Sequence, residues 1–268
     1  MRILLASAAA LVIAGTASAA DFPVGTAYVP SVIPVFNWTG CYLGGYVGQA
    51  FAKNINVLDA DNFAAQPNSL DVWRYALKSS TPGGGGTAGC NWQPSGTPWL
   101  VGIEGEGGYF KLSGSGYDPS FPLGSNVLLA STTVGNGYAM ATARLGYVVD
   151  RFLFYIKGGA AFSNESISVT QPQIGPFTPF VASASGLETT GAFGGGIEWA
   201  FAYNWTAKAE YMFLGSNTNS VCGVATAASV PGVPGSYCWN HSGLSGFSTA
   251  KIGVNYLFNG AGPVIARY

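Results

Sequence analysis

The chain has 268 residues and a formal net charge of −1; only 9% of its residues are charged, while 48% are hydrophobic and 14% are aromatic. A soluble domain carries about 25% charged residues, so we expect much of this surface not to face water. The near-neutral charge argues against a nucleic-acid partner. No apolar run of about 18 residues follows the N-terminal segment, which argues against a helical membrane protein.

The first 19 residues have the three parts of a secretory signal peptide. Arg2 gives a basic start, residues 3–14 form an apolar core, and residues 17–19 form an A-x-A site. The apolar run is too short to favour the alternative of a membrane anchor, so we expect cleavage after Ala19. Residues 20–37 contain three prolines without sustained alternation and are predicted to be a periplasmic N-terminal tether.

Eight segments after the tether alternate between apolar and polar or small residues. The pattern is clearest in residues 249–258, T-A-K-I-G-V-N-Y-L-F. In residues 38–51 we expect the face with Tyr42 and Tyr46 to point inward. Successive side chains on a strand point to opposite faces, and about ten tilted residues cross a membrane. The predicted strands are residues 38–51, 84–93, 99–112, 137–149, 152–163, 187–202, 205–214 and 249–258.

The connections between these strands alternate in length. Residues 52–82, 113–136, 164–186 and 215–244 read as long irregular loops, whereas residues 94–98, 150–151 and 203–204 are short turns. An even strand count with this asymmetry is typical of bacterial outer-membrane barrels, whose short turns and termini lie in the periplasm. We therefore predict an all-β fold: an eight-stranded antiparallel up-and-down transmembrane β-barrel over residues 38–258, with long extracellular loops and a C-terminal extension at 259–268.

Aromatic residues near the short-turn ends of the strands are expected to form one interfacial girdle. These residues are Trp38, Trp92, Trp99, Phe152, Tyr203, Trp205 and Phe258.

Four acids and four bases fall on the predicted inward face. They are Glu104, Glu106, Arg144, Lys157, Glu198, Lys208, Glu210 and Lys251. An unpaired charge in a narrow lumen is costly, so this balance predicts a paired network that plugs or narrows the barrel. The pairs expected from neighbouring strands are Glu106 with Arg144, Lys157 with Glu198, and Glu210 with Lys208 and Lys251. Glu104 and Glu106 could instead be a general acid/base pair or part of a cation-selective ring, but the equal number of bases favours salt bridges.

Four cysteines enter an oxidising compartment after export. Cys222 and Cys238 have fifteen residues between them in one predicted loop, which favours a disulfide. Cys41 and Cys90 could form a second disulfide or act as small lipid-facing hydrophobic residues, and the pattern does not choose between them. No C-x-x-C spacing occurs, so we expect no metal site.

His241 is the only histidine of the chain. A lone loop histidine is most often solvated; the alternatives are a haem ligand and a Ser-His hydrolytic pair with Ser242. The sequence offers no orienting acid for such a pair, so we expect no enzymatic activity.

Several segments together resemble the alphaproteobacterial outer-membrane β-barrel proteins, a porin-family group that includes surface antigens and haemin-binding members. They include W-T-G-C-Y-L-G-G-Y-V-G at 38–48, A-G-C-N-W-Q at 88–93, V-G-I-E-G-E at 101–106, A-R-L-G-Y-V-V-D-R-F-L-F-Y-I-K-G-G at 143–159, G-G-G-I-E-W-A at 194–200, N-W-T-A-K-A-E-Y at 204–211 and K-I-G-V-N-Y-L-F at 251–258. The resemblance covers all eight predicted strands and little of the loops. It implies an eight-stranded barrel in the outer membrane with a porin-like or structural function.

The chain departs from that family at Cys41 and Cys90, where the family usually has bulky aromatics. The loops contain no haem motif, so haemin binding is not carried over. Outer-membrane barrels usually end in an aromatic insertion signal, and either Phe258 or Tyr268 takes that part.

We therefore predict a non-enzymatic barrel without a cofactor, with a role in envelope integrity and at most a narrow pore. Its expected partners are outer-membrane lipid and, through the C-terminal strand, the barrel-assembly machinery. The alternatives are a small-solute porin and a surface receptor that binds haemin or another ligand through its loops.

Overall fold

The structure is a computed structural model that describes residues 36–52, 54–59, 72–76, 80–118, 128–173, 178–215, 217, 219–225, 235–242 and 246–258. The predicted signal peptide, most of the tether and the C-terminal extension with Tyr268 lie outside these residues. Within the described part of the chain, no helix has the length and apolar character needed to cross a membrane.

All described secondary structure is β-strand, and every strand pairing is antiparallel. The strands are β1 (Gly40–Ala52), β2 (Asn54–Asp59), β3 (Val72–Ala76), β4 (Ser80–Trp92), β5 (Trp99–Tyr109), β6 (Lys111–Tyr117), β7 (Leu129–Val149), β8 (Phe152–Gln171), β9 (Phe180–Ala200), β10 (Trp205–Leu214), β11 (Asn219–Ala225), β12 (Gly235–Ser242) and β13 (Phe247–Leu257).

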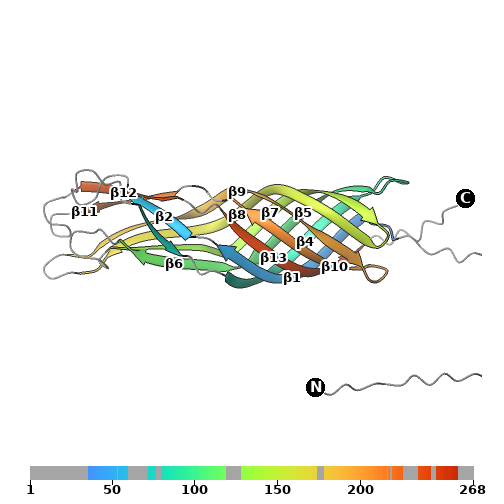
Figure 1. The fold of residues 1–268 in the computed structure, drawn as a ribbon, viewed down its shortest axis with the longest axis horizontal. Coiled ribbons are helices and arrows are strands. Elements are labelled where there is room, and N and C mark those ends of the chain that lie inside the picture. The colour runs from blue at the N-terminus through green and yellow to red at the C-terminus, as the bar shows by residue number, and fades with distance from the viewer. Residues whose placement is uncertain are drawn as a thin grey trace, which may run out of the picture. The chain divides into compact units, whose positions relative to one another are not determined.

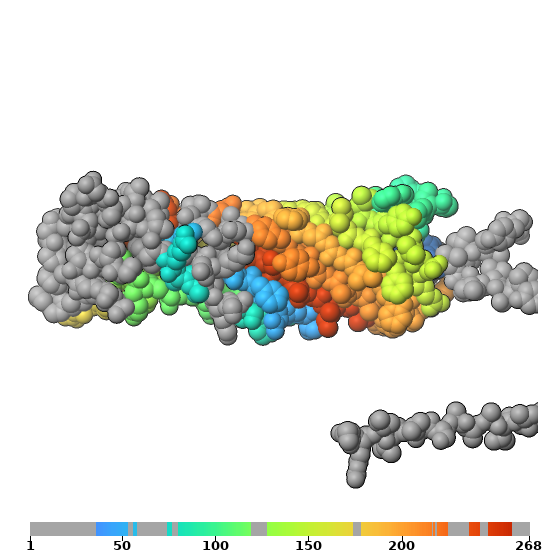
Figure 2. All heavy atoms as spheres, viewed as in Figure 1, coloured from blue at the N-terminus to red at the C-terminus, as the bar shows by residue number. Residues whose placement is uncertain are grey.

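Eight strands close into a barrel in the order β5-β4-β1-β13-β10-β9-β8-β7, and β7 pairs back onto β5. The predicted eight-stranded antiparallel barrel is therefore confirmed (Figure 1). β1 and β13, near opposite ends of the chain, lie side by side in this wall, as the blue and red surfaces in Figure 2 show.

The described parts of the long connections also form strands, so the prediction of irregular loops is wrong there. In the order of the chain, β2 and β3 come between β1 and β4, and β11 and β12 come between β10 and β13. These four strands form a second sheet in the order β11-β12-β2-β3. β6 follows β5 and pairs with the N-terminal part of β7, from Leu129 to Gly135. We call β2, β3, β6, β11 and β12, together with the adjoining halves of β7, β8 and β9, the head. The remaining strands and strand halves form the base barrel.

The head repeats the strand order of the base barrel. In the head, β6-β7-β8-β9 are hydrogen-bonded neighbours, β11 contacts β9, and β3 contacts β6. Strands that end in the base barrel are therefore continued by head strands at the same place in the wall. β6 continues β5, β11 continues β10, and β2 continues β1. The long connections are hairpins that prolong the barrel wall.

A bulge marks the level where base barrel and head meet, which we call the waist. The register of β7 against β8 shifts between Val134 and Tyr138. Gly135, Asn136 and Gly137 between them all have positive φ, a conformation that glycine and asparagine adopt more readily than other residues. The Asn136 amide donates to the carbonyl of Phe110 at 2.8 Å, which joins the bulge to the β5–β6 junction.

Side-chain chemistry inverts across the waist on both faces of the wall. On β8, the exposed outward residues of the base barrel are apolar, and those of the head carry hydroxyl groups: Phe152, Phe154 and Ile156, then Ser166. The inward residues change in the opposite sense, from Tyr155 and Lys157 to Ile167 and Val169. The head strands therefore alternate with the reverse of the polarity that a membrane barrel predicts, and for this reason the sequence pattern does not indicate them.

An apolar cluster closes the short-turn end of the lumen. It contains Trp38, Leu100, Leu153, Tyr155 and Ala200. Trp38 is fully buried, so its predicted place in the girdle is wrong: the chain enters the lumen just before β1, and the Trp38 ring packs edge-on against Phe36 with centroids 4.9 Å apart. The other six predicted girdle residues are all exposed on the wall.

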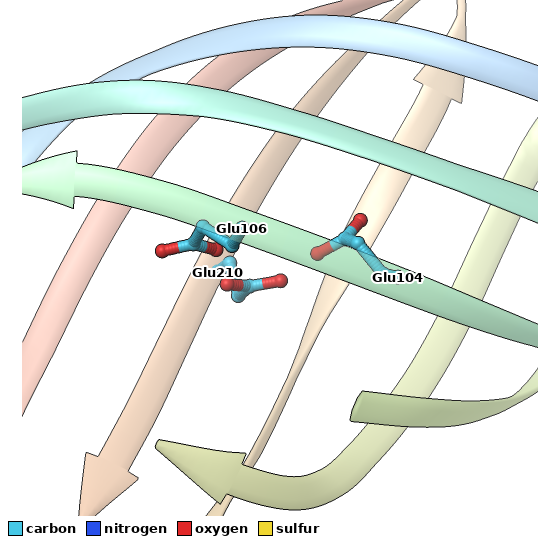
Figure 3. A group of neighbouring side chains, drawn as sticks. All are labelled: Glu104, Glu106 and Glu210. Atoms are coloured by element: carbon cyan, nitrogen blue, oxygen red, sulfur yellow. The ribbon is translucent and has the colours of Figure 1, made fainter. Parts of the chain in front are cut away.

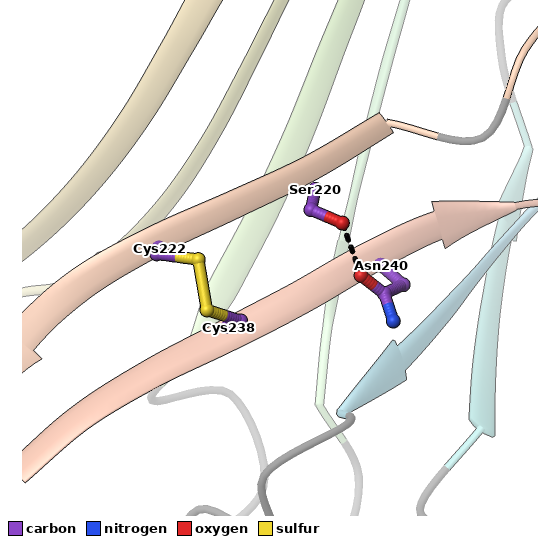
Figure 4. The surroundings of a disulfide bond; sticks show 4 residues. All are labelled: Ser220, Cys222, Cys238 and Asn240. Carbon is purple, nitrogen blue, oxygen red and sulfur yellow. Dashed lines mark hydrogen bonds between the residues drawn. A yellow bond between two sulfur atoms is a disulfide. The ribbon is translucent and has the colours of Figure 1, made fainter.

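Both cysteine pairs form disulfides, Cys41 with Cys90 and Cys222 with Cys238. In each pair the two cysteines lie directly opposite on neighbouring strands. The register of β1 against β4 therefore answers the question that the sequence left open for Cys41 and Cys90. In the head, the hydroxyl of Ser220 also bonds the side-chain oxygen of Asn240 beside the disulfide (Figure 4).

We predict that replacing Cys222 and Cys238 by serine loosens the head without unfolding the base barrel. Closing a loop of this size stabilises by roughly 3 kcal/mol through chain entropy. Limited proteolysis of the purified protein should show faster cleavage within the head. Serine replacement of Cys41 and Cys90 is the matched control and should leave that cleavage rate unchanged; equal rates for both double variants would contradict the prediction.

Candidate functional site

The lumen of the base barrel contains a charged cluster. The predicted inward acids and bases all point into it, and each is only 1–5% exposed. The four glutamates and four bases give this lumen network a formal charge of zero, and every member takes part in an ion pair. Because desolvated charges are costly unless paired, the balance of acids and bases is a condition for this lumen to fold.

Lys157 is the centre of the lumen network. Its ammonium nitrogen lies 2.6 Å from Glu104, 2.7 Å from Glu210 and 3.7 Å from Glu106. These three carboxylates project from β5 and β10 toward one another (Figure 3), and one oxygen of each lies within 4.8 Å of the others. Three such oxygens resemble the start of a cation site. The Lys157 ammonium already binds the same carboxylates, so the residues as they stand do not fit a metal ion.

The remaining pairs surround this centre. Lys251 contacts Glu106 at 2.6 Å and Glu210 at 2.9 Å. Lys208 contacts Glu104 at 3.2 Å. Arg144 contacts Glu198 at 2.9 Å and Glu104 at 3.8 Å.

Most of the expected pairings between neighbouring strands are wrong. Arg144 pairs with Glu198 and Glu104 rather than Glu106, because the register sets Gly102 opposite Arg144. Lys157 does not pair with Glu198, and Lys208 reaches Glu104 instead of Glu210. Of the expected contacts, Lys251 with Glu210 is present. The lumen is narrow enough for long side chains to reach across it to strands that are not their neighbours.

Tyrosines that the sequence analysis did not assign to the site complete the lumen network. Tyr42 donates to Glu104 at 2.7 Å, Tyr138 to Glu106 at 2.6 Å, and Tyr155 to Glu210 at 3.0 Å. The Arg144 guanidinium also lies 4.0 Å from the centre of the Tyr155 ring, in cation–π distance. The inward parity of these tyrosines on their strands is the signal that could have found them.

Glu198 has a separate set of neutral partners. Thr206 and Asn255 both donate to its Oε1, Asn255 at 2.7 Å, and the Asn255 oxygen accepts from Thr87 at 3.3 Å. With Arg144 on the other oxygen, this carboxylate has donors on both sides. Such saturation of acceptors favours a fixed structural role over proton transfer.

Apolar layers bound the lumen network on both sides. Toward the short turns lies the cluster around Trp38 and Leu100. Toward the head lies a larger cluster, in which Phe110 packs on Phe247 and Tyr138 with ring centroids 4.9 and 4.8 Å apart. A small cavity of about 10 Å³, roughly one water molecule, is lined by Lys251 of the lumen network and by Phe110 and Tyr138 of this second layer. Between these two layers the side chains of the lumen network are only 1–5% exposed.

His241 is buried in the head, only 4% exposed, so the expectation of a solvated histidine is wrong. It lies on β12, opposite Asn219 of β11 and Val57 of β2, and follows the fully buried Trp239. The connection that seemed to be a loop is a strand, and the histidine falls on its inward face. Burial lowers the pKa of His241 from its ordinary 6.5 to about 4. The Ser242 side chain lies outside the described residues.

A closed barrel whose outward face is a band of exposed apolar residues, and whose charges are paired inside, is a transmembrane β-barrel. A family model described as outer membrane protein beta-barrel domain matches residues 7–258. The chain belongs to this family and resides in the bacterial outer membrane.

Two curated relatives carry the name 31 kDa outer-membrane immunogenic protein, from Brucella melitensis and Brucella suis. Each is 30% identical over 265 residues, which is 96% of this chain and 99% of the relative. Among solved structures, Ail of Yersinia pestis is 14% identical and the N-terminal barrel domain of Pseudomonas aeruginosa OprF is 12% identical. Both alignments cover 82% of this chain and nearly all of the other, with a TM-score of 0.38.

We predict that Lys157→Met strongly destabilises the barrel. It leaves the carboxylates of Glu104, Glu106 and Glu210 without their shared cation, and breaking a buried ion pair costs about 3–5 kcal/mol. Urea unfolding in detergent micelles, followed by the heat-modifiable shift on gels, measures the loss.

The matched variant is Lys157→Met combined with Glu210→Gln, because Lys251 keeps its contact with Glu106 when Glu210 is neutral. It restores a net charge of zero and should recover much of the lost stability. A single variant as stable as the wild type, or a double variant less stable than the single one, would contradict the central place of Lys157.

The lowered pKa of His241 predicts acid sensitivity of the head. The unfolded chain binds the proton more tightly than the folded one, so the histidine costs stability as the pH falls from about 6.5 to about 4. Glu165 of the head works the other way, because burial raises its pKa to about 6 and folding then favours its protonated form. The His241 contribution is therefore read from His241→Leu, which should lose less head stability between pH 7 and pH 4.5 than the wild type. Hydrogen exchange of the β12 amides measures this, and parallel pH profiles would disprove it.

Proposed function

We propose that this protein is a sealed, non-enzymatic barrel that strengthens the outer membrane and holds its head on the cell surface. The observation that supports the proposal is a neutral ion-pair network, buried in the base barrel between two apolar layers. An eight-stranded barrel is just wide enough for its own side chains, and here they occupy it.

The porin alternative requires a path through these buried side chains. Opening one would break several of the buried ion pairs around Lys157 and displace either Trp38 or the Phe110–Phe247 contact. The cost of breaking even one buried pair exceeds the free energy of ordinary thermal fluctuations several-fold. A stable conducting state is therefore disfavoured.

The receptor alternative in its haemin form rested on His241, and the burial of that ring removes the exposed ligand it needs. Display of the head on the cell surface does not depend on haemin binding. It agrees with the name of the Brucella relatives, which calls them immunogenic. It also agrees with the long-loop side of bacterial barrels facing outward.

For assembly, we propose that β13 is the strand presented to the barrel-assembly machinery. It closes the barrel against β1, and the amide of Phe258, directly after it, donates to the carbonyl of Cys41 at 2.9 Å. The Phe258 side chain is exposed at the short-turn end among the girdle aromatics, packing on Tyr256 with centroids 5.5 Å apart. This placement favours Phe258 as the terminal aromatic signal.

Planar-bilayer recording tests the sealed lumen. The purified protein, shown to be folded by its heat-modifiable mobility, should give no steady current steps above the bilayer background. Phe110→Gly combined with Phe247→Gly opens the layer near the waist and serves as a comparison for leak through a weakened barrel. Steady, nanosiemens-scale openings of the wild type would contradict the proposal and favour a porin.

A further inference from the structure

The outward face of the head carries an ordered array of hydroxyl groups. Strand register places eight serine and threonine residues in two parallel rows across β6, β7, β8 and β9. The row nearer the waist is Ser113, Thr133, Ser166 and Ser185; the row farther from it is Ser115, Ser131, Ser168 and Ser183. All eight side chains are exposed or half-buried. We call this face the hydroxyl array.

The hydroxyl array is regular in both directions. Neighbouring strands lie about 4.8 Å apart and alternate residues of one strand about 7 Å apart. The Ser131 and Ser168 hydroxyls bond each other at 2.7 Å, which leaves each with spare hydrogen-bonding capacity. The result is a regular grid of groups that both donate and accept hydrogen bonds.

Charge is nearly absent from this face. Among its described outward residues on β6 and on the head portions of β7, β8 and β9, Lys111 at the edge near the waist is the charged one. A soluble domain usually carries about 25% charged residues, so this face is unusually poor in charge. A neutral hydroxyl face therefore matches a neutral, hydroxyl-bearing partner.

An aromatic side chain adjoins the array. Tyr117 follows Ser115 by two residues on β6 and is 48% exposed, so its ring lies on the same face. An exposed ring offers an apolar surface together with a polar tip. Carbohydrates present the matching chemistry, since a sugar ring has an apolar C–H face and equatorial hydroxyls around its edge.

A polar depression lies where the array meets the apolar band. It has a volume of about 400 Å³; hydroxyl and amide side chains such as Asn136, Asn164, Ser166 and Ser185 line it, together with Leu187 and the buried acid Glu165. On the base-barrel side the same wall exposes Ile156 and Phe193, which face the acyl chains of the membrane. A molecule with acyl chains in the membrane and sugars above it would meet the apolar band, the depression and the hydroxyl array in that order.

We propose that the hydroxyl array binds the neutral saccharide chain of the glycolipid in the outer leaflet of the same membrane. The proposal rests on the proposed function, because it needs the head to face outward. Hydroxyl groups of the array replace water around the sugar, and Tyr117 packs on a sugar ring. The sealed barrel then acts as an anchor that tethers the polysaccharide layer to the membrane wall.

The test uses the full mature protein in lipid nanodiscs and two forms of lipopolysaccharide: one with a neutral polysaccharide chain, and one truncated to the lipid and its phosphates. The array variant combines Ser115→Ala, Ser131→Ala, Ser168→Ala and Ser183→Ala. The control variant, Ser236→Ala with Ser248→Ala, removes hydroxyls from β12 and β13 across the barrel. Calorimetric titration measures binding, and heat-modifiable mobility verifies that each variant is folded.

We expect the wild type and the control to bind the long form at least tenfold more tightly than the truncated form. The array variant and Tyr117→Ala should lose that preference. Free neutral oligosaccharide released from the long form should compete with it. Equal binding of both forms by the wild type would overturn the proposal, because recognition would then lie in the phosphates or acyl chains.

Unchanged preference in the array variant would also overturn it. So would a wild-type dimer that the array variant abolishes without any saccharide effect, since the partner would then be a second copy of the chain. Trypsin added to intact cells tests the outward orientation separately, and the bilayer recording tests the sealed lumen. If either the trypsin test or the bilayer recording fails, the proposed function is contradicted, while the titration still decides whether the array binds the saccharide.

Discussion

The reversal of solvent at the waist is the constraint on which the rest of this structure depends. One continuous wall passes from lipid into water, and on β8 the exposed outward positions are apolar below the waist and polar above it. The interior responds in the opposite sense: charged and tyrosine side chains fill the base barrel, while the head has an apolar core like that of a soluble domain. The bulge at Gly135, Asn136 and Gly137 lies where the two regimes meet.

The charged interior is stable because it is neutral, saturated and enclosed. Lys157 holds three carboxylates, tyrosine hydroxyls satisfy remaining acceptors, and apolar layers exclude water at both sides. Buried ion pairs do not by themselves add much stability, but they penalise any arrangement that separates them. The lumen network therefore fixes the mutual positions of β5, β7, β8, β9, β10 and β13, much as a core does in a soluble barrel.

Much of the base barrel could be predicted from sequence. Period-two alternation, tight turns such as residues 150–151, and the balance of charges are local signals, and they led to the correct strands and to the correct inward residues. The ion pairs were not predictable in the same way, because Arg144 and Lys208 reach across the lumen and their partners depend on register and tilt. Trp38 was misplaced because nothing local distinguishes an aromatic that enters a lumen from one that lines a membrane interface.

The head was missed for a physical reason. Its strands alternate serine or threonine with small apolar residues, as in Ser166–Ile167–Ser168–Val169, and the expected polarity for a membrane barrel is the reverse. His241 lies in one of these strands, and a sequence pattern that predicts a loop there gives no sign that the histidine is buried in the head core. The eight-residue hydroxyl array likewise emerges only when strand register aligns serines that are far apart in sequence.

Site-directed spin labelling along the outward positions of β8 tests the inversion at the waist most directly. Labels at Phe154, Ile156, Ser166 and Ser168, in the protein reconstituted into bilayers, report collisions with oxygen, which concentrates in lipid, and with a water-soluble nickel complex. The account predicts oxygen-dominated collisions at Phe154 and Ile156 and nickel-dominated collisions at Ser166 and Ser168. Lipid exposure at the two serines, or water exposure at Phe154 and Ile156, would contradict it.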